Sequence, residues 1–191
     1  VGQRGQGELN IGSGGSLNVG GALVAGIVEN SSGIVNVTDG GTVVADSVFL
    51  GQDANSVGTM VVSGASSVTT DTFELGRRGE ALLRVENGGI VRATTSLIAE
   101  SPDGPSGDYG QTGRIEVRGV GSAIEAARVD ATASLLIEDG GAIRSDVANI
   151  KNSFGAGTGE GRAKATLTGS GSEWVNTGAM KVTTDLQVLD G

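Results

Sequence analysis

The stretch from Gly33 to Gly51, GIVNVTDGGTVVADSVFLG, decides the fold. Two apolar residues separated by one residue precede an Asp-Gly-Gly turn at 39–41, and two more such pairs follow it. In order, the three pairs are Val35/Val37, Val43/Ala45 and Val48/Leu50. Because residues two apart lie on the same face of a strand, the stretch predicts three short strands, each with one apolar face. We call this unit a rung.

The first strand of the rung recurs along the whole chain, with a period of about 25 residues in its regular part. Its apolar pairs are Leu9/Ile11, Val35/Val37, Met60/Val62, Leu83/Val85, Ile115/Val117, Leu135/Ile137, Ala165/Leu167 and Leu186/Val188. The third strand recurs in the same way, with Phe73/Leu75, Leu97/Ala99, Ala127/Val129 and Ala148/Ile150 among its pairs. The chain is therefore expected to be a repeat protein.

The corner after the first strand alternates between two forms. From Gly40 onward, the glycine follows the last apolar residue by three positions and by two positions in turn. The longer form begins with Asp or Asn before Gly-Gly, as at Asp39, and the shorter is Gly-x-Gly-Ser or similar, as at Gly119. Gly and Asx accept the positive φ that such corners need, so we interpret these residues as structural and the true repeat as a double rung.

A single rung cannot bury its own apolar faces, but a stack of rungs can, since each strand then pairs in parallel with its copy in the next rung. The sequence therefore predicts an all-β fold, a right-handed parallel β-helix with three sides and about seven or eight rungs. Helix signals are sparse. The segment EAARVDATA at 125–133 contains helix formers, but it stands where a strand belongs and is expected to be strand plus turn.

Composition narrows the function. The chain has no Cys and no His, which removes disulfides, thiolate and imidazole metal ligands and the usual general base. Its net charge is -9 without a basic stripe, so nucleic acid is not an expected partner. No apolar run is long enough to predict membrane insertion of this segment. We predict no cofactor, no metal and no enzymatic activity.

The segment ATLTGSGSEW at 165–174, continued by NTGAMKV at 176–182, resembles the passenger-domain repeats of type V secretion autotransporters. The resemblance covers nearly the whole chain and implies one segment, 1–191, of a longer passenger domain. It further implies export through the outer membrane of a Gram-negative bacterium, display at the cell surface, and a parent protein with a C-terminal membrane barrel. Family members usually act as adhesins, in autoaggregation or in biofilm formation, so the resemblance also implies a role in virulence.

The resemblance and the regular rungs move the search for a site to the two long connections, 100–112 and 151–162, which we expect to protrude from the same edge about 10 Å apart. Exposed aromatic residues on such loops are good anchors for a protein or a glycan. The candidate binding residues are Asp103, Asp108, Tyr109, Lys151, Phe154 and Arg162. Expected partners are a host matrix or cell-surface protein, a glycan, or a second copy of the chain.

Two other functions remain open. Parallel β-helices also carry polysaccharide lyases and hydrolases, for which Glu116 near Arg84, or Glu138 near Asp139, would be the candidates. We expect these groups to be ordinary solvent-facing charges instead. The chain could also be a passive spacer, with the function elsewhere in its parent protein.

Overall fold

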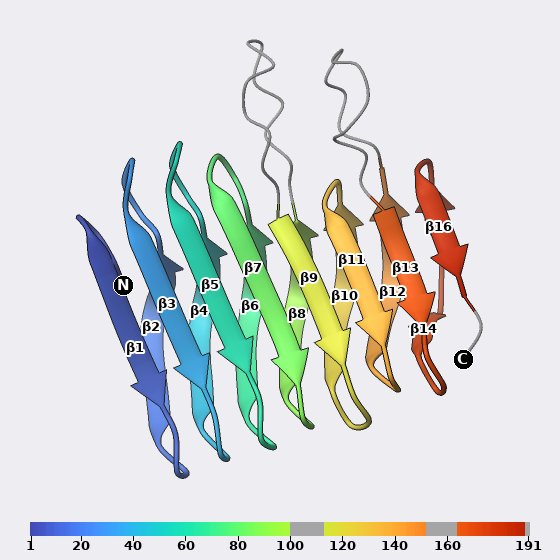
Figure 1. Cartoon of the computed structure of the whole chain (residues 1–191), viewed down its shortest axis with the longest axis horizontal. Coiled ribbons are helices and arrows are strands. Elements are labelled where there is room, and N and C mark those ends of the chain that lie inside the picture. Colours follow the sequence, from blue (N-terminus) through green and yellow to red (C-terminus); the bar gives the residue numbers. More distant parts are fainter. Residues whose placement is uncertain (100–112, 152–163, 190–191) are drawn as a thin grey trace.

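The computed structural model describes residues 1–99, 113–151 and 164–189. These residues form 16 parallel strands and no helix, arranged as two stacked sheets (Figure 1). The first sheet, which we call sheet A, contains, in order, β1 (Gln6–Ile11), β3 (Ser32–Val37), β5 (Val57–Val62), β7 (Glu80–Glu86), β9 (Gly113–Arg118), β11 (Ser134–Glu138), β13 (Lys164–Thr168) and β16 (Asp185–Val188).

Sheet B lies behind sheet A and is built from the longer strands. It contains β2 (Ser16–Ala25), β4 (Thr42–Leu50), β6 (Ser67–Leu75), β8 (Ile90–Ala99), β10 (Ala123–Ala131), β12 (Ala142–Ile150) and β14 (Glu173–Asn176), while β15 (Met180–Val182) also pairs with β12. In Figure 1 the chain runs down sheet A in front and back up sheet B behind it, and advances from left to right, which makes the solenoid right-handed. The expected parallel β-helix is confirmed.

The second and third strands expected in each rung are one continuous strand with a bend in most rungs. In the pair formed by β4 and β6, the ladder runs from Ala45 with Thr70 to Ser47 with Thr72 and passes over the residue between them. Small residues on the inside of the bend, such as Ala45, leave room for the chain to turn without breaking the pairing. The three sides of the rung therefore belong to two sheets and not to three.

One expected core pair is wrong by two residues. The pair Ala127/Val129 was expected to face inward, but β10 is in register with β8 through Val129 with Leu97 and Ala131 with Ala99. Val129 and Ala131 are the buried residues, at 0% and 2% exposed. Between these pairs and the pair of Ala126 with Ala93, β8 has one residue more than β10, and the register shifts there by one residue. The segment 125–133 is otherwise strand followed by a short turn, as expected.

Apolar side chains fill the space between the sheets. The first-strand pairs from Val35/Val37 to Leu135/Ile137 are at most 2% exposed, and Phe73 is the largest of the fully buried residues. In the described residues the last rung is paired on one side only, and its Met180, Leu186 and Val188 are 39%, 40% and 74% exposed. Stacking is thus what buries each rung.

The alternation of corners has a physical cause in the hydrogen bonds between rungs. Asp39, at φ 51°, begins a long corner whose Gly40 N–H donates to Ser66 Oγ of the short corner above it, at 3.1 Å. The same bond recurs twice, from Gly88 N–H to Ser122 Oγ at 3.0 Å and from Gly140 N–H to Ser172 Oγ at 3.2 Å. The long corners at 39–41, 87–89 and 139–141 are therefore each tied to a short one, which supports the double rung as the repeating unit in this part of the chain.

Candidate functional site

Most of the predicted binding residues lie outside the described residues, namely Asp103, Asp108, Tyr109, Phe154 and Arg162. Only Lys151 is described. It follows β12 directly, its side chain is exposed, and its backbone N–H donates to Ala131 O at 2.8 Å. The positions of the two connections therefore follow from the strands that precede and follow them.

Those strands place both connections at the same edges of the solenoid. The first connection joins β8 to β9 and the second joins β12 to β13. Strands β9 and β13 both pair with β11, so the two connections rejoin sheet A two ladder steps apart, or about 10 Å. Between them, β10 reaches β11 through Thr132 and Ala133 alone.

A small polar group beside Lys151 has a defined electrostatic character. Asp130 accepts hydrogen bonds from Arg128 Nη2 at 3.2 Å and from Asn149 Nδ2 at 2.7 Å. Burial by itself raises the pKa of Asp130, but these hydrogen bonds and the charges of Arg128 and Lys151 outweigh it, so the pKa is below its ordinary value. The same partnership raises the pKa of Arg128. Asp130 is thus held as a carboxylate near the end of β10, hydrogen-bonded to Asn149 of β12, the strand from which the second connection leaves.

The strongest cluster of charges in the described residues lies on the outer face of sheet A. We call it the Glu116 cluster, and it consists of Arg84, Arg114, Glu116, Arg118 and Glu138. Residues 114, 116 and 118 alternate along β9 and therefore share its outer face. Arg84 of the neighbouring strand β7 is in register with Glu116, so Arg84 lies beside the three residues of β9.

Within this cluster, three guanidinium groups surround one carboxylate. Glu116 Oε2 lies 2.9 Å from Arg84 Nε and 3.1 Å from Arg118 Nη2, while its Oε1 lies 2.6 Å from Arg114 Nη2. Arg118 Nε is also 2.8 Å from Glu138 Oε1, as an ion pair whose N–H is not aligned for a hydrogen bond. The arginines cover Glu116 so completely that only 1% of its surface is exposed, although it faces outward.

The position of Glu116 agrees with one expectation from the sequence and corrects another. Glu116 does lie beside Arg84, but it is not the solvent-facing charge that the sequence suggested. Both of its oxygens lie within 3.1 Å of guanidinium nitrogens. Glu138 pairs with Arg118, and Asp139 adopts φ 52° in a corner, which accounts for these two residues structurally.

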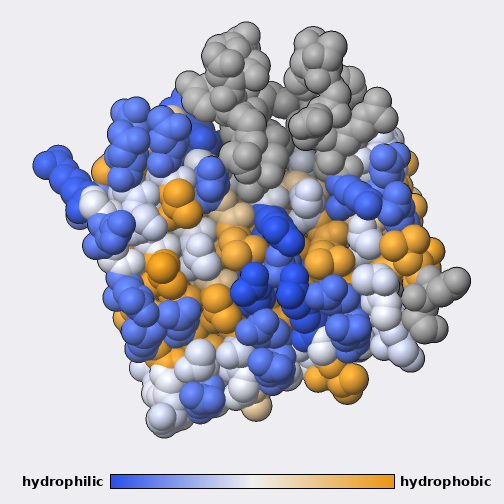
Figure 2. All heavy atoms as spheres, in the orientation of Figure 1, coloured by the Kyte–Doolittle hydropathy of each residue, from blue (hydrophilic) through white to orange (hydrophobic). Residues whose placement is uncertain are grey.

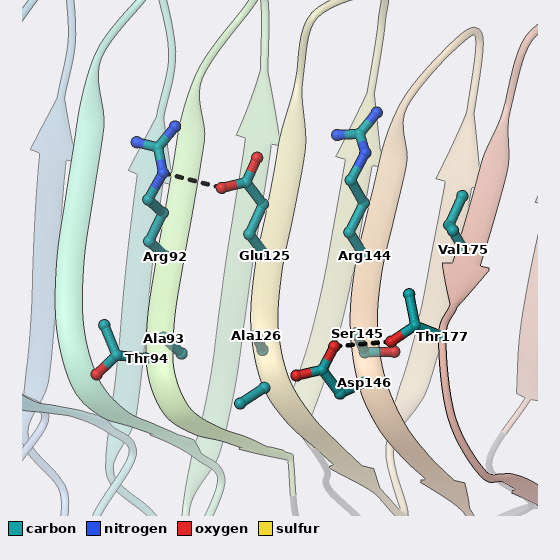
Figure 3. Close-up of a pocket in the computed structure, with 11 residues that line it drawn as sticks. Arg92, Ala93, Thr94, Glu125, Ala126, Arg144, Ser145, Asp146, Val175 and Thr177 are labelled. Carbon is teal, nitrogen blue, oxygen red and sulfur yellow. Dashed lines mark hydrogen bonds and ion pairs between the residues drawn. The ribbon is translucent and has the colours of Figure 1, made fainter.

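A shallow groove of about 440 Å³ follows the bend of sheet B across β8, β10, β12 and β14 (Figure 3). Its floor is made of small residues, with Ala93 and Ala126 among them, and one wall carries Arg92, Glu125 and Arg144 in a row. This groove was not predicted from the sequence. The signal, outward charges at one register position in successive rungs, was hidden by the unequal lengths of the intervening connections.

The polar groups of the groove are already paired with one another. Arg92 Nε lies 2.9 Å from Glu125 Oε2, and Arg144 Nη2 lies 2.6 Å from Glu173 Oε1. At the bend, Thr177 Oγ1 donates to Asp146 Oδ1 at 2.8 Å. Each of these arginines stands with a carboxylate of its own, whereas the Glu116 cluster gathers three arginines around one carboxylate, so the groove is a weaker candidate for binding an anion.

The described parts of the chain contain no group of three or more acidic residues placed to hold a metal ion. Among the same residues, no helix has the length and apolar character to span a membrane. The fold and the outward clusters define the class of protein: a right-handed parallel β-helix with polar sites on its outer faces. Comparison with models of protein families, with curated proteins and with solved structures found no match for this chain.

Proposed function

We propose that the chain is a surface-displayed attachment segment, an adhesin like those of autotransporter passengers, located outside a bacterial cell and acting without catalysis. The observation that carries this proposal is the placement of the two long connections. Both join the same edges of the solenoid, while the rung between them closes the same corner with Thr132 and Ala133 alone. Long connections that the fold does not need are a common place for binding residues.

The regular solenoid supports the same reading, because it would hold such connections in a fixed relation to each other. Strand β11 pairs with both β9 and β13, and the core beneath these strands is filled. Two weak contacts held about 10 Å apart can act together on one partner. The partner we propose is a matrix or cell-surface protein or glycan of a host, or a second copy of the chain in a biofilm.

The test is to shorten both connections to the length that the solenoid itself uses. Deleting 101–112 leaves Glu100 between β8 and Gly113, the first residue of β9, and deleting 152–162 leaves Lys151 and Ala163 between β12 and β13. Both pairs then occupy the register positions of Thr132 and Ala133, because Ala131 is in register with Ala99 and with Ile150. The shortened chain should therefore fold, which a thermal melt would check.

We expect the intact chain to bind cultured cells, immobilised matrix proteins or itself, and the shortened chain to lose that binding while it melts as a folded β protein. Equal binding by the two chains would contradict the loop mechanism. Failure of the intact chain to bind any of these surfaces would favour the passive spacer. Turnover of an acidic polysaccharide, abolished by substitution of one carboxylate, would favour an enzyme instead.

A further inference from the structure

We infer that the Glu116 cluster is a binding site for the acidic groups of a polysaccharide. The inference deepens the proposed function, because it names a class of partner and a second contact surface. It rests on the described residues of sheet A alone and does not involve the long connections.

The geometry of the arginines supports this reading. Glu116 holds three guanidinium groups in one place, with contacts of 2.6 to 3.1 Å. An arginine normally loses considerable side-chain freedom when it binds a ligand, and a carboxylate that already fixes the side chain removes much of that cost. The buried carboxylate therefore acts as a template for the arginines.

The arginines retain donors for a second anion. Each guanidinium has five N–H groups. Arg84 donates its Nε–H to Glu116, and Arg114 forms an ion pair with it through Nη2. The remaining N–H groups of these two side chains have no partner among the described residues, and the side chains are 35% and 56% exposed. Glu86 lies in register beside Arg118 without forming an ion pair with it. Oxyanions such as carboxylate and sulfate accept two parallel N–H donors from one guanidinium.

Aliphatic side chains border the cluster on both sides. Leu82 is in register with Arg114, and Leu136 is in register with Glu116 on the opposite side. Both are half-buried. Figure 2 shows the strongly hydrophilic group in the middle of this face, with hydrophobic side chains beside it. An acidic sugar fits this arrangement, since its oxyanion can reach the guanidinium groups while the apolar face of its ring lies on a leucine.

The site lies on the open face of a sheet and not in a cavity, so a small free anion would remain largely in water. A polymer gains from repeated contacts along the solenoid. Nucleic acid is a poorer fit, because duplex DNA carries one charge per about 1.7 Å, denser than one carboxylate per sugar, and is repelled more by a chain of net charge -9. The acidic polysaccharide is therefore the partner that the charges favour.

The test uses the whole chain and four polymers: polygalacturonate, dextran sulfate, uncharged dextran and duplex DNA. Binding is measured by biolayer interferometry at about 0.15 M salt, where distant charges are screened. We expect binding to polygalacturonate, dextran sulfate or both, and none to dextran. Selective binding of one polymer identifies carboxylate or sulfate as the group recognised. DNA binding as tight as that of the polysaccharides would overturn the inference.

The variant Arg114→Gln should weaken polysaccharide binding about tenfold or more, since it removes charge-assisted hydrogen bonds from the most exposed arginine of the cluster. Arg84→Gln gives a second reading at the same site, and Arg114→Lys, which keeps the charge without the planar fork, should lie between wild type and Arg114→Gln. The matched control is Arg78→Gln, which removes an exposed arginine from an ion pair with Asp53, outside both the Glu116 cluster and the groove, and should change binding less than about twofold.

An equal loss in the control would mean that net charge alone is measured and would overturn the inference, as would the absence of binding to either acidic polysaccharide. The chain with both connections shortened keeps the Glu116 cluster and should still bind the polysaccharide. Loss of cell attachment in that chain with retained polysaccharide binding would thus separate the two proposals.

Discussion

Replacing Ser122 by alanine tests whether the paired corners are what holds the double rung together. Ser122 is 1% exposed, and its Oγ accepts the Gly88 N–H at 3.0 Å. Alanine removes this acceptor with almost no change in shape and leaves the half-buried Gly88 N–H without its partner. Loss of one neutral hydrogen bond of this kind costs about 1 kcal/mol, and for a chain of this length that lowers Tm by about 2–4 °C.

The assay is a thermal melt followed by circular dichroism, supported by urea unfolding. Ser170→Ala is the matched control, because Ser170 lies in the equivalent short corner but is exposed, and we expect no measurable change in Tm from it. Ser66→Ala should lower Tm less than Ser122→Ala, because the Gly40 N–H that Ser66 Oγ accepts also donates to Gly64 O at 2.8 Å and keeps that partner. Destabilisation no greater than that of Ser170→Ala would refute the reasoning.

Two further predictions follow. Phe73→Ala should lower the free energy of unfolding, measured in urea, by about 3–5 kcal/mol, because it removes the largest fully buried side chain. Phe49→Ala is the control and should cost much less, since Phe49 lies on the outer side of the neighbouring strand β4. Similar losses from the two variants would contradict the assigned register. Because the pKa of Asp130 is lowered by folding, its contribution to stability is present above its ordinary pKa of 3.8 and is lost as the pH falls through the folded value. The Tm advantage of wild type over Asp130→Asn should therefore disappear as the pH is lowered below about 4, and an advantage that does not change with pH would contradict this account.

The fold could be predicted because stacking leaves few choices for the residues that face inward or turn a corner. Val35 and Val37 had to be apolar to fill the core, and Asp39 had to tolerate positive φ. The bend of sheet B could not be predicted in the same way, since inward alternation continues through it. In β10, alanines at 126 and 127 fit either register, and only pairing with β8 shows that Val129 and Ala131 face the core.

The candidate site was less predictable, because outward residues are set by neighbours that the chain reaches only after a full rung. Arg84 and Glu116 were correctly paired from the sequence, but the burial of Glu116 was not foreseen. It depends on Arg114 and Arg118 closing over the carboxylate from the same strand. The alternation of Arg, Glu and Arg at 114, 116 and 118 was the available signal. It indicates a buried carboxylate only when the neighbouring strand β7, with Arg84 beside Glu116, is known.

Glu116 is an exception to the pattern of the repeat, and the exception is informative. In a solenoid, inward positions are constrained by packing and outward positions are free to be polar and wet. Glu116 faces outward and yet is buried, so neither rule accounts for it. A buried ion pair is a poor source of stability, since desolvation offsets much of the attraction. An outward carboxylate that is covered by three arginines is better explained by what it does to them: it fixes their positions on an open face, where a ligand can reach their remaining donors.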